Sequence, residues 1–461
     1  MNLEIKLMQH LRHLSSDGNS TIIYDVRSMA LFEVDNVTAM ILEDAFLSRC
    51  SLEELHNRSR VLLDLHGIDS SHVDQSIASI VDLVNKGILT DAPPGSMEIS
   101  TLPLRIDTIL LNISQDCQLG CKYCFASQGT FHDSSLKPLM DVETGRRAVD
   151  FLFSVADKSF TKYVLIFFGG EPLMNWPLIE ELVAYSNSVA ILHGKVMDFR
   201  ITTNAIEIDE KKADFLAKHN FNIVVSLDGD EEVHNELRPH KNLSINSYQK
   251  TVEAISILRS KNIEVAGRAT LTSKFINPSL IEKMLFNSGV SRVAHQMISC
   301  LPDDPLILNE AQIREYASHI AEQVFNTDVP NTQREILLAR LEDGVISHYE
   351  CGFSNVSMSV DSLGRIYACH RVIAQNDYYV GSVFDKLEYD KIRNIQKRTN
   401  INVKLGCRSC WARFLCRGCC PSDNLVMTGS IAIPNSYSCY VRQRLIDAVF
   451  EYLLSNRKNT L

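Results

Sequence analysis

Three cysteines in one short run offer the most reactive chemistry in this chain. Cys117, Cys121 and Cys124 have the spacing C-x3-C-x2-C, and no fourth cysteine lies nearby. Cysteine thiolates are the usual ligands of iron–sulfur clusters, and four of them close a cubane. Three would hold a [4Fe–4S] cluster by three irons and leave the fourth iron open to a small molecule. The alternative is a structural zinc site completed by His132, although structural zinc prefers paired Cys or His groups.

A glycine-rich motif strengthens the cluster interpretation. The run Gly169-Gly170-Glu171-Pro172 directly follows a predicted strand. Glycines let the backbone approach a ligand closely, and a carboxylate beside them can accept hydrogen bonds from an ammonium group. With the cysteine spacing and Tyr123, this motif resembles the radical S-adenosylmethionine (radical SAM) superfamily. In that family the open iron binds the amino and carboxylate groups of SAM, and an electron from the cluster releases a 5′-deoxyadenosyl radical.

The resemblance also implies which residues contact SAM. Glu171 takes the role of the glutamate that binds the methionine amine, and the implied contacts are Tyr123, Gly169, Gly170, Glu171, Asn204, Ser226 and Asp228. His234 and Arg238 resemble family positions too, or are solvated charges. Arg268 begins inside a strand and either faces the site or pairs with a core carboxylate. The sequence assigns no catalytic acid or base.

The segment 103–326 has the alternation of strands and helices that must position these residues. The predicted strands are Thr108–Ile113, Tyr163–Phe168, Asp198–Thr203, Ile223–Leu227, Glu264–Thr270 and Arg292–Gln296, with amphipathic helices between them such as Val142–Ala156, Pro177–Val189 and Ser247–Ser260. Six such units give a parallel sheet, and right-handed crossovers would curl it into a partial (β/α)6 barrel. A doubly wound sheet is the alternative. Active sites of such α/β folds lie at the carboxyl ends of the strands, which is where the motifs fall.

The C-terminal third carries a second set of cysteines, in the order Cys351, Cys369, Cys407, Cys410, Cys416, Cys420 and Cys439. Its order, with Gly364 in a turn between two strands, closely resembles the SPASM domain of radical SAM maturases, which we place at 340–445, before a C-terminal helix and tail at 446–461. The resemblance implies one auxiliary [4Fe–4S] cluster on Cys407, Cys410, Cys416 and Cys439 and another on Cys351, Cys369 and Cys420. Two zinc knuckles at Cys407/Cys410 and Cys416/Cys419 are the alternative. The remaining Cys50, Cys300 and Cys419 are expected to be core thiols, although a ligand role for Cys419 stays open.

Residues 1–95 are predicted to form a separate module. Two short alternating strands within Thr21–Asp35 precede three amphipathic helices, the second opened by a capping box at Ser51–Glu54 and the third closed by Gly87. This order resembles the winged-helix-like, PqqD-like recognition elements of peptide-modifying radical SAM enzymes, in which a leader peptide adds a strand to the sheet edge. A structural extension or a DNA-binding winged helix is the alternative. A turn-rich linker, Asp91–Glu98, follows.

Composition narrows the cellular setting. Of 461 residues, 45% are hydrophobic and the formal net charge is −10, with no basic stripe. We therefore expect no nucleic-acid partner. The sequence shows neither a signal peptide nor an apolar run that could span a bilayer, which predicts a cytoplasmic protein without a membrane partner. Thirteen cysteines in a reducing compartment indicate metal sites rather than disulfides.

Taken together, the resemblance implies an enzyme that modifies a ribosomally made peptide. The deoxyadenosyl radical would abstract a hydrogen from the peptide and lead to an intrapeptide crosslink, either a thioether or a C–C or C–O bond. A flavodoxin- or ferredoxin-like protein would supply electrons. Two alternatives stay open. Sulfatase-maturing oxidases usually carry Asp after the second SPASM cysteine, where this chain has His370. A non-catalytic iron–sulfur electron carrier would need neither the open-iron loop nor the Gly-Gly-Glu-Pro motif.

Overall fold

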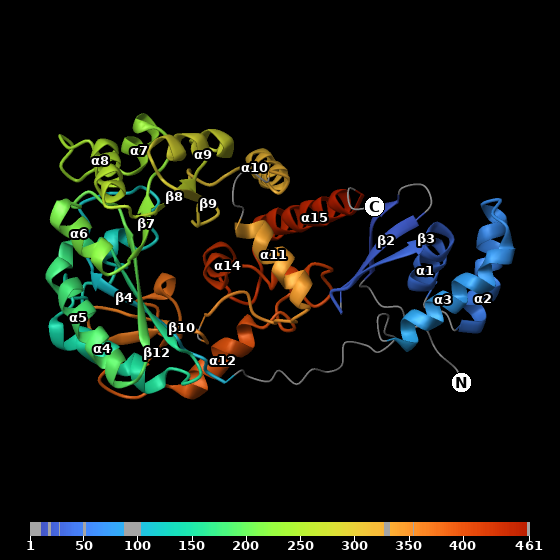
Figure 1. The fold of residues 1–461 in the computed structure, drawn as a ribbon, viewed down its shortest axis with the longest axis horizontal. Helices are drawn as coiled ribbons and strands as arrows, with labels where there is room; N and C mark the ends of the chain where they lie inside the picture. The colour runs from blue at the N-terminus through green and yellow to red at the C-terminus, as the bar shows by residue number, and fades with distance from the viewer. Residues whose placement is uncertain are drawn as a thin grey trace.

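The computed structural model describes residues 11–16, 20–26, 28–48, 52–86, 103–326, 332–353 and 355–458. Figure 1 shows an elongated molecule in three parts. The α/β barrel lies at one end, the N-terminal module at the other, and the C-terminal helices lie between them. The predicted capping residue Ser51, the helix-ending Gly87, the linker and Cys50 lie outside the described residues.

The first part contains six parallel strands in sequence order, as the sequence predicts. They are β4 (Thr108–Ser114), β5 (Lys162–Gly169), β6 (Val196–Thr203), β7 (Asn222–Ser226), β8 (Val265–Leu271) and β9 (Arg292–Met297). The helices between them are α4 (Val142–Val155), α5 (Trp176–Leu192), α6 (Glu210–Lys218), α7 (Glu231–Leu237), α8 (Ser247–Ser260) and α9 (Pro278–Asn287). The predicted α/β architecture is confirmed.

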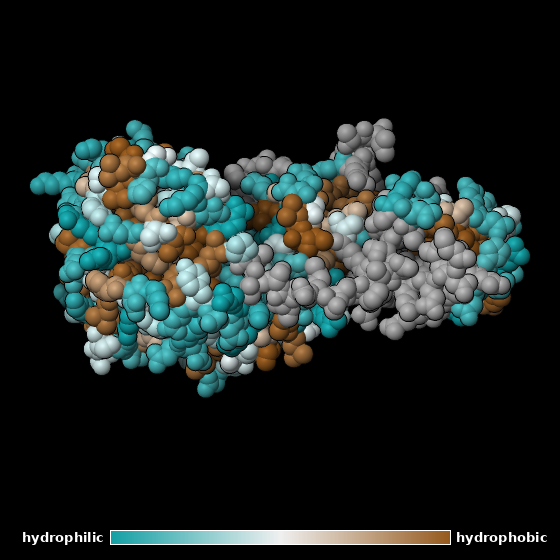
Figure 2. Space-filling model, turned by 90° about the horizontal axis from the view of Figure 1, so that it is seen from below, coloured by the Kyte–Doolittle hydropathy of each residue, from teal (hydrophilic) through white to brown (hydrophobic). Residues whose placement is uncertain are grey.

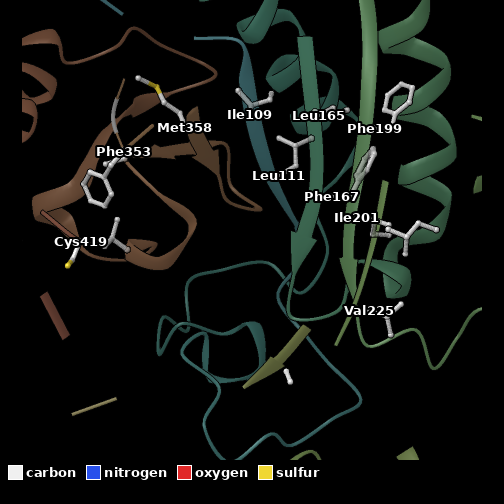
Figure 3. Packing of buried hydrophobic residues seen from close by; sticks show 14 of the residues in the cluster. Ile109, Leu111, Leu165, Phe167, Phe199, Ile201, Val225, Phe353, Met358 and Cys419 are labelled. Carbon is white, nitrogen blue, oxygen red and sulfur yellow. The ribbon is translucent and has the colours of Figure 1, made fainter. Parts of the chain in front are cut away.

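Local sequence explains why these elements form where they do. The strands are rich in buried Val, Ile, Leu and Phe, and neighbouring strands pack Leu111, Leu165, Phe167 and Ile201 into one core (Figure 3). Five of the helices begin after an Asp or Asn whose side chain accepts a hydrogen bond from a backbone N–H in the first turn, at Asp141, Asp209, Asp230, Asn246 and Asn277. These caps fix where each loop at the barrel end meets its helix.

The sheet continues beyond the barrel into the C-terminal part. Strand β10 (Ser357–Val360) pairs in parallel with β4, and β11 (Arg365–Tyr367) and β12 (Tyr379–Ser382) extend it antiparallel, giving nine strands. The two strands expected on either side of Gly364 are β10 and β11. Sequence patterns did not reveal that they would join the barrel sheet, because strand pairing depends on tertiary contacts. One sheet therefore contains strands from both predicted domains, 103–326 and 340–445.

Helices and turns make up the rest of the C-terminal part. The helices are α10 (Glu310–Gln323), α11 (Thr332–Asp343), α12 (Tyr389–Thr399), α13 (Arg413–Cys416), α14 (Pro421–Thr428) and α15 (Ser436–Lys458). The predicted C-terminal helix exists but begins at Ser436 rather than at residue 446. Helix α15 packs along α10 and points toward the N-terminal module (Figure 1).

Among its described residues, the N-terminal module has three strands and three α-helices. Strands β1 (Leu11–Ser16), β2 (Ser20–Asp25) and β3 (Leu31–Asp35) form an antiparallel sheet with β2 in the centre, followed by α1 (Asn36–Ser48), α2 (Leu52–Leu65) and α3 (Val73–Asn85). The sequence predicted β2, β3 and the helices but missed β1, which lacks clear alternation. Both faces of β2 are covered, because Ile23 packs against the module's own helices and the ring of Tyr24 lies 4.9 Å from that of Phe450 on α15.

Candidate active site

The three-cysteine loop follows β4 at the carboxyl end of the sheet. Its backbone is tied to the end of α7 and the segment after it by hydrogen bonds from Lys122 N–H to the Leu237 carbonyl (2.9 Å) and from Gly120 N–H to the Pro239 carbonyl (2.8 Å). Cys117, Cys121 and Cys124 all line one open cavity of about 1080 Å³. The loop therefore brings the three sulfurs to the carboxyl end of the sheet, where α/β folds bind their ligands.

Donor groups converge on these sulfurs. Leu119 N–H lies 3.4 Å from the Cys117 sulfur, and Gln128 N–H lies 3.1 Å from the Cys124 sulfur. The Asn204 side-chain amide donates to Cys117 at 3.6 Å, and the Arg238 guanidinium lies 3.9 Å from the Cys121 sulfur. Amide and guanidinium donors stabilise negative charge on sulfur, so this environment suits thiolate ligands of an iron–sulfur cluster.

The two glycines of the second motif press the end of β5 against the cysteine loop. A Cβ on Gly169, whose φ is +146°, would lie 2.2 Å from the Ser114 carbonyl oxygen. A Cβ on Gly170 would lie 2.3 Å from the carbonyl oxygen of Asp116, directly before Cys117. No larger residue fits without backbone movement. Both glycines line the cavity, where the motif predicts that a ligand approaches the backbone.

Glu171 is buried at the floor of this cavity and is held firmly. Its Oε1 accepts hydrogen bonds from Thr203 Oγ1 (2.6 Å) and Leu173 N–H (3.0 Å), and its Oε2 accepts one from Asn204 N–H (2.8 Å). Burial raises the pKa of Glu171 to about 7, although these hydrogen bonds act in the opposite direction. An ammonium group in the cavity would stabilise the charged form, because a carboxylate can accept a fourth hydrogen bond.

The ends of β6 and β7 bring the other predicted contacts to the same place, with one difference. Asn204 and Ser226 line the cavity, whereas Asp228 is not part of the lining. Its carboxylate accepts hydrogen bonds from Arg238 Nε (2.8 Å), Thr270 N–H (2.9 Å) and the Tyr123 hydroxyl. Asp228 thus supports two residues that do line the cavity, Tyr123 and Arg238, and its direct contact with SAM stays a prediction.

The structure gives the positions of three further residues whose roles the sequence left undecided. Arg238 is buried, paired with Asp228 and stacked over the Tyr123 ring, so it is not a solvated charge. Arg268 lines the cavity and donates to Gln296 Oε1 (2.7 Å). His234 is buried outside the lining and accepts a hydrogen bond from Asp228 N–H, and burial lowers its pKa to about 3. His234 is therefore a neutral structural group.

Residues from the C-terminal part complete the cavity wall, and sequence reasoning missed them. His370 and Arg371 reach the cavity from beside Cys369. The His370 ring lies 4.9 Å from that of Phe168, and the Arg371 guanidinium lies over the Phe125 ring. Nothing in the sequence places the segment after Cys369 against the barrel; the pairing of β10 with β4 does.

The C-terminal cysteines have two sets of electrostatic neighbours, and their assignment to two clusters stays a prediction. Cys351 has Cys420 and Cys369 as electrostatic neighbours. In the same way, Cys407 has Cys416, Cys439 and Cys410 as electrostatic neighbours. Cys419 is a buried thiol, as expected, but its sulfur lies 3.6 Å from that of Cys416, so it belongs to the second group. Cys300 is buried elsewhere.

A cation whose side chain is at least largely buried lies beside each cysteine group, which bears on whether anionic thiolates fit there. Arg238 lies beside Cys121, and the Arg371 guanidinium lies 3.7 Å from the Cys420 sulfur and 2.5 Å from Asp423. Lys404 is 2% exposed and donates to the carbonyl oxygens of Gly418 (2.6 Å) and Cys419 (3.4 Å). Burial raises the pKa of Cys407 to about 12, and the Lys404 ammonium group opposes part of that rise. A buried cation requires negative charge nearby. Asp228 and Asp423 pair with the two arginines, and Lys404 donates to carbonyl oxygens. Thiolates of a cluster would add to the negative charge beside each cation, so the donor sets fit iron–sulfur clusters.

Comparisons with known proteins agree with this geometry. Residues 111–277 match the family model described as the Radical SAM superfamily. The radical SAM cyclopropyl synthase TigE of Paramaledivibacter caminithermalis is 22% identical over 97% of this chain and 96% of its own length. The segment that matches the family model includes the three-cysteine loop and the Gly-Gly-Glu-Pro motif.

Two solved structures show the same fold. Native anSMEcpe with bound AdoMet has a TM-score of 0.64 at 19% identity, over 77% of this chain and all of that chain. Streptococcus suis SuiB bound to its precursor peptide SuiA has a TM-score of 0.51 at 15% identity, over 95% of this chain and 99% of that one. The likeness to SuiB thus extends over nearly the whole chain.

Within the described part of the chain, none of the helices is long and apolar enough to cross a membrane. On the face shown in Figure 2, hydrophilic residues interrupt the apolar groups.

Proposed function

We propose that this protein is a radical SAM enzyme that crosslinks a ribosomally synthesised precursor peptide. The observation that carries the proposal is a single open cavity lined by the three-cysteine loop, by Glu171 and by Arg371 of the cysteine-rich C-terminal part. Such a cavity can bring a SAM-binding group, a substrate and a second redox centre within reach of one another. A simple electron carrier needs no cavity of this kind.

Different residues of this chain would bind the cluster and the separate parts of SAM. Cys117, Cys121 and Cys124 would hold a [4Fe–4S] cluster, which would supply the electron for reductive cleavage of SAM to methionine and a 5′-deoxyadenosyl radical. Glu171 would accept a hydrogen bond from the SAM amine, and the backbone at Gly169 and Gly170 would let the methionine part lie close. Tyr123, Asn204 and Ser226 would contact the remainder of SAM, with Asp228 holding Tyr123 in place.

A second cavity gives the substrate a path toward the auxiliary cysteines. It measures about 960 Å³, shares Gln296, Met297, Ile298 and Ser299 with the first cavity, and reaches Cys419 and Cys420. A peptide lying across the shared wall would expose one residue to the SAM site and another to the group of Cys351, Cys369 and Cys420. Electrons removed during crosslinking would leave through clusters on the two C-terminal cysteine groups.

The N-terminal module would bind the leader of the precursor peptide. Among the described residues, β3 pairs only with β2, so its outer edge is available for an added strand. Its side chains are half-buried or exposed, which leaves the backbone accessible. Hydrogen exchange of the wild-type enzyme with and without leader peptide tests this. We expect protection of β3 amides but not of those in the exposed helix α2. Equal exchange of β3 in both states would remove the module from leader binding.

The product would be an intrapeptide bond. The group of Cys351, Cys369 and Cys420 has three sulfurs, so a peptide thiolate could complete it and then form a thioether with a carbon radical. The relative TigE is named a cyclopropyl synthase, which supports carbon–carbon bond formation as an alternative to a thioether or a C–O bond. A flavodoxin- or ferredoxin-like donor would deliver electrons.

Mass spectrometry tests the proposal. The reconstituted enzyme is incubated anaerobically with SAM, reductant and the peptide encoded next to its gene. We expect the peptide to lose two hydrogens and to fragment as a crosslinked ring, with a Cys→Ser peptide unreactive if the bond is a thioether. Deoxyadenosine formation with an unchanged peptide would contradict the crosslinking function.

A further inference from the structure

A second set of metal-ligating side chains lies outside the cysteine groups. Glu282 on α9, His295 on β9 and His319 on α10 each direct one ligand atom to a common point, and these atoms all lie within 4.8 Å of one another. His295 Nε2 lies 2.8 Å from Glu282 Oε1, and His319 Nε2 lies 3.5 Å from the same oxygen. Ligands about 2.0–2.1 Å from a tetrahedral ion are separated by roughly 3.3 Å, so the spacing is close to that of a filled site.

The hydrogen bonds around this set orient both rings toward the common point. The Tyr316 hydroxyl lies 3.2 Å from His295 Nδ1, and the Ser279 hydroxyl lies 2.8 Å from His319 Nδ1. Each histidine therefore uses Nδ1 for a hydroxyl partner and presents Nε2 inward. A metal-ligating histidine almost always has such a partner on its other nitrogen, which fixes the ring orientation.

An unpartnered atom supplies an independent indication. His319 is 6% exposed, and its Nε2 has no hydrogen-bond partner among the described residues. Its 3.5 Å contact with the Glu282 oxygen is longer than a good hydrogen bond, and metal coordination would satisfy this buried nitrogen more fully. The nearby Arg442, which could oppose a cation, is itself paired with Glu350 at 2.9 Å.

We propose that Glu282, His295 and His319 bind a divalent transition-metal ion of the zinc class. Two imidazoles and one carboxylate are a common donor set for such ions, and three protein ligands leave a fourth position open. Of the three ligands, His295 lines the second cavity, as does Tyr316, so the site lies beside a space that shares its wall with the cavity of the three-cysteine loop. Water or an oxygen atom of a bound molecule would occupy it.

Zinc K-edge X-ray absorption tests the proposal on the intact enzyme, because iron is silent at that edge. Iron-loaded protein is given one equivalent of Zn²⁺, desalted and checked for unchanged iron content. We expect about one retained zinc per chain, with nitrogen and oxygen ligands at about 2.0–2.1 Å and no sulfur shell at about 2.3 Å. Failure to retain zinc, or a sulfur shell from displaced cluster cysteines, would overturn the proposal.

Two variants assign the site. The double variant Glu282→Gln/His319→Gln keeps the side-chain sizes and should weaken zinc binding at least tenfold. A matched His219→Gln change, at the end of α6, should leave it unchanged. Undiminished zinc binding by the double variant would also overturn the assignment. The wild-type spectrum decides the question independently if the double variant does not fold.

Discussion

The two cysteine-bearing regions of this molecule are built in opposite ways. In the barrel, Cys117, Cys121 and Cys124 lie on one loop whose position is set by a parallel sheet and two glycine contacts. In the C-terminal part, segment 400–420 consists of turns and the single short helix α13, yet it carries five cysteines. The first region has a scaffold independent of metal. The second lacks one, so its clusters should be part of its fold.

Removing the metal should produce the largest difference between the regions. Metal binding to such a site is folding free energy, because the site has little structure of its own. After anaerobic chelation of all iron, we expect amide exchange in residues 400–440 to rise on the order of a hundredfold, with much smaller changes in β4, β5 and β6. Hydrogen exchange with mass spectrometry measures this. Equal loosening of both regions would show that the barrel site also depends on its cluster.

Replacing Glu171 tests the scaffolded region. The Glu171→Ala change should weaken SAM binding by about 1.5–3 kcal/mol, roughly ten- to a hundredfold, because the SAM amine loses a charged acceptor. Glu180→Ala, at an exposed position on α5, is the control. Equilibrium binding of SAM to the iron-loaded enzyme gives the answer. Unchanged affinity would remove Glu171 from the site.

Replacing Lys404 tests whether the stability of the cysteine-rich C-terminal part depends on its clusters. Lys404 is buried and is an electrostatic neighbour of Cys407. Its ammonium group would therefore lie near thiolates in the loaded enzyme and would be a buried charge without them in the iron-free protein. Lys404→Met should therefore destabilise the loaded protein by about 1–3 kcal/mol and destabilise the iron-free protein less, or stabilise it. Denaturant unfolding under anaerobic conditions measures both states, with the exposed Lys397→Met as control. Equal losses in both states would mean that Lys404 acts only through its carbonyl contacts.

The smallest effect is expected where the two regions meet. Arg371 contacts the Cys420 sulfur and also lines the barrel cavity. Arg371→Met should lower the reduction potential of the neighbouring auxiliary cluster by roughly tens of millivolts, because a positive charge near the cluster favours its reduced form. A redox titration followed by electron paramagnetic resonance measures the shift, with Arg393→Met as the exposed control. A shift to higher potential would contradict this electrostatic role.

Local patterns in the sequence predicted the barrel well, and long-range contacts explain what was missed. The six strands lie within two residues of their predicted bounds, because buried apolar runs and turn residues define them locally. The cysteine and glycine motifs could be read because each is contiguous. In contrast, the pairing of β10 with β4, the arrival of Arg371 in the cavity and the convergence of Glu282, His295 and His319 join segments distant in sequence. The position of Asp228 could not be predicted either, because its place in a motif does not show whether its side chain lines the cavity or holds the residues that do.

Reductive cleavage of SAM by a loop variant tests the central claim most directly. The triple variant Cys117→Ala/Cys121→Ala/Cys124→Ala and the wild-type enzyme are reconstituted with iron and sulfide, reduced anaerobically and supplied with SAM. Deoxyadenosine is then quantified by liquid chromatography with mass spectrometry, beside the iron content of each protein. We predict that the variant forms no deoxyadenosine while it keeps the iron of the C-terminal cysteine groups. Deoxyadenosine at the wild-type rate from the triple variant would contradict the assignment of this loop as the SAM-cleaving site.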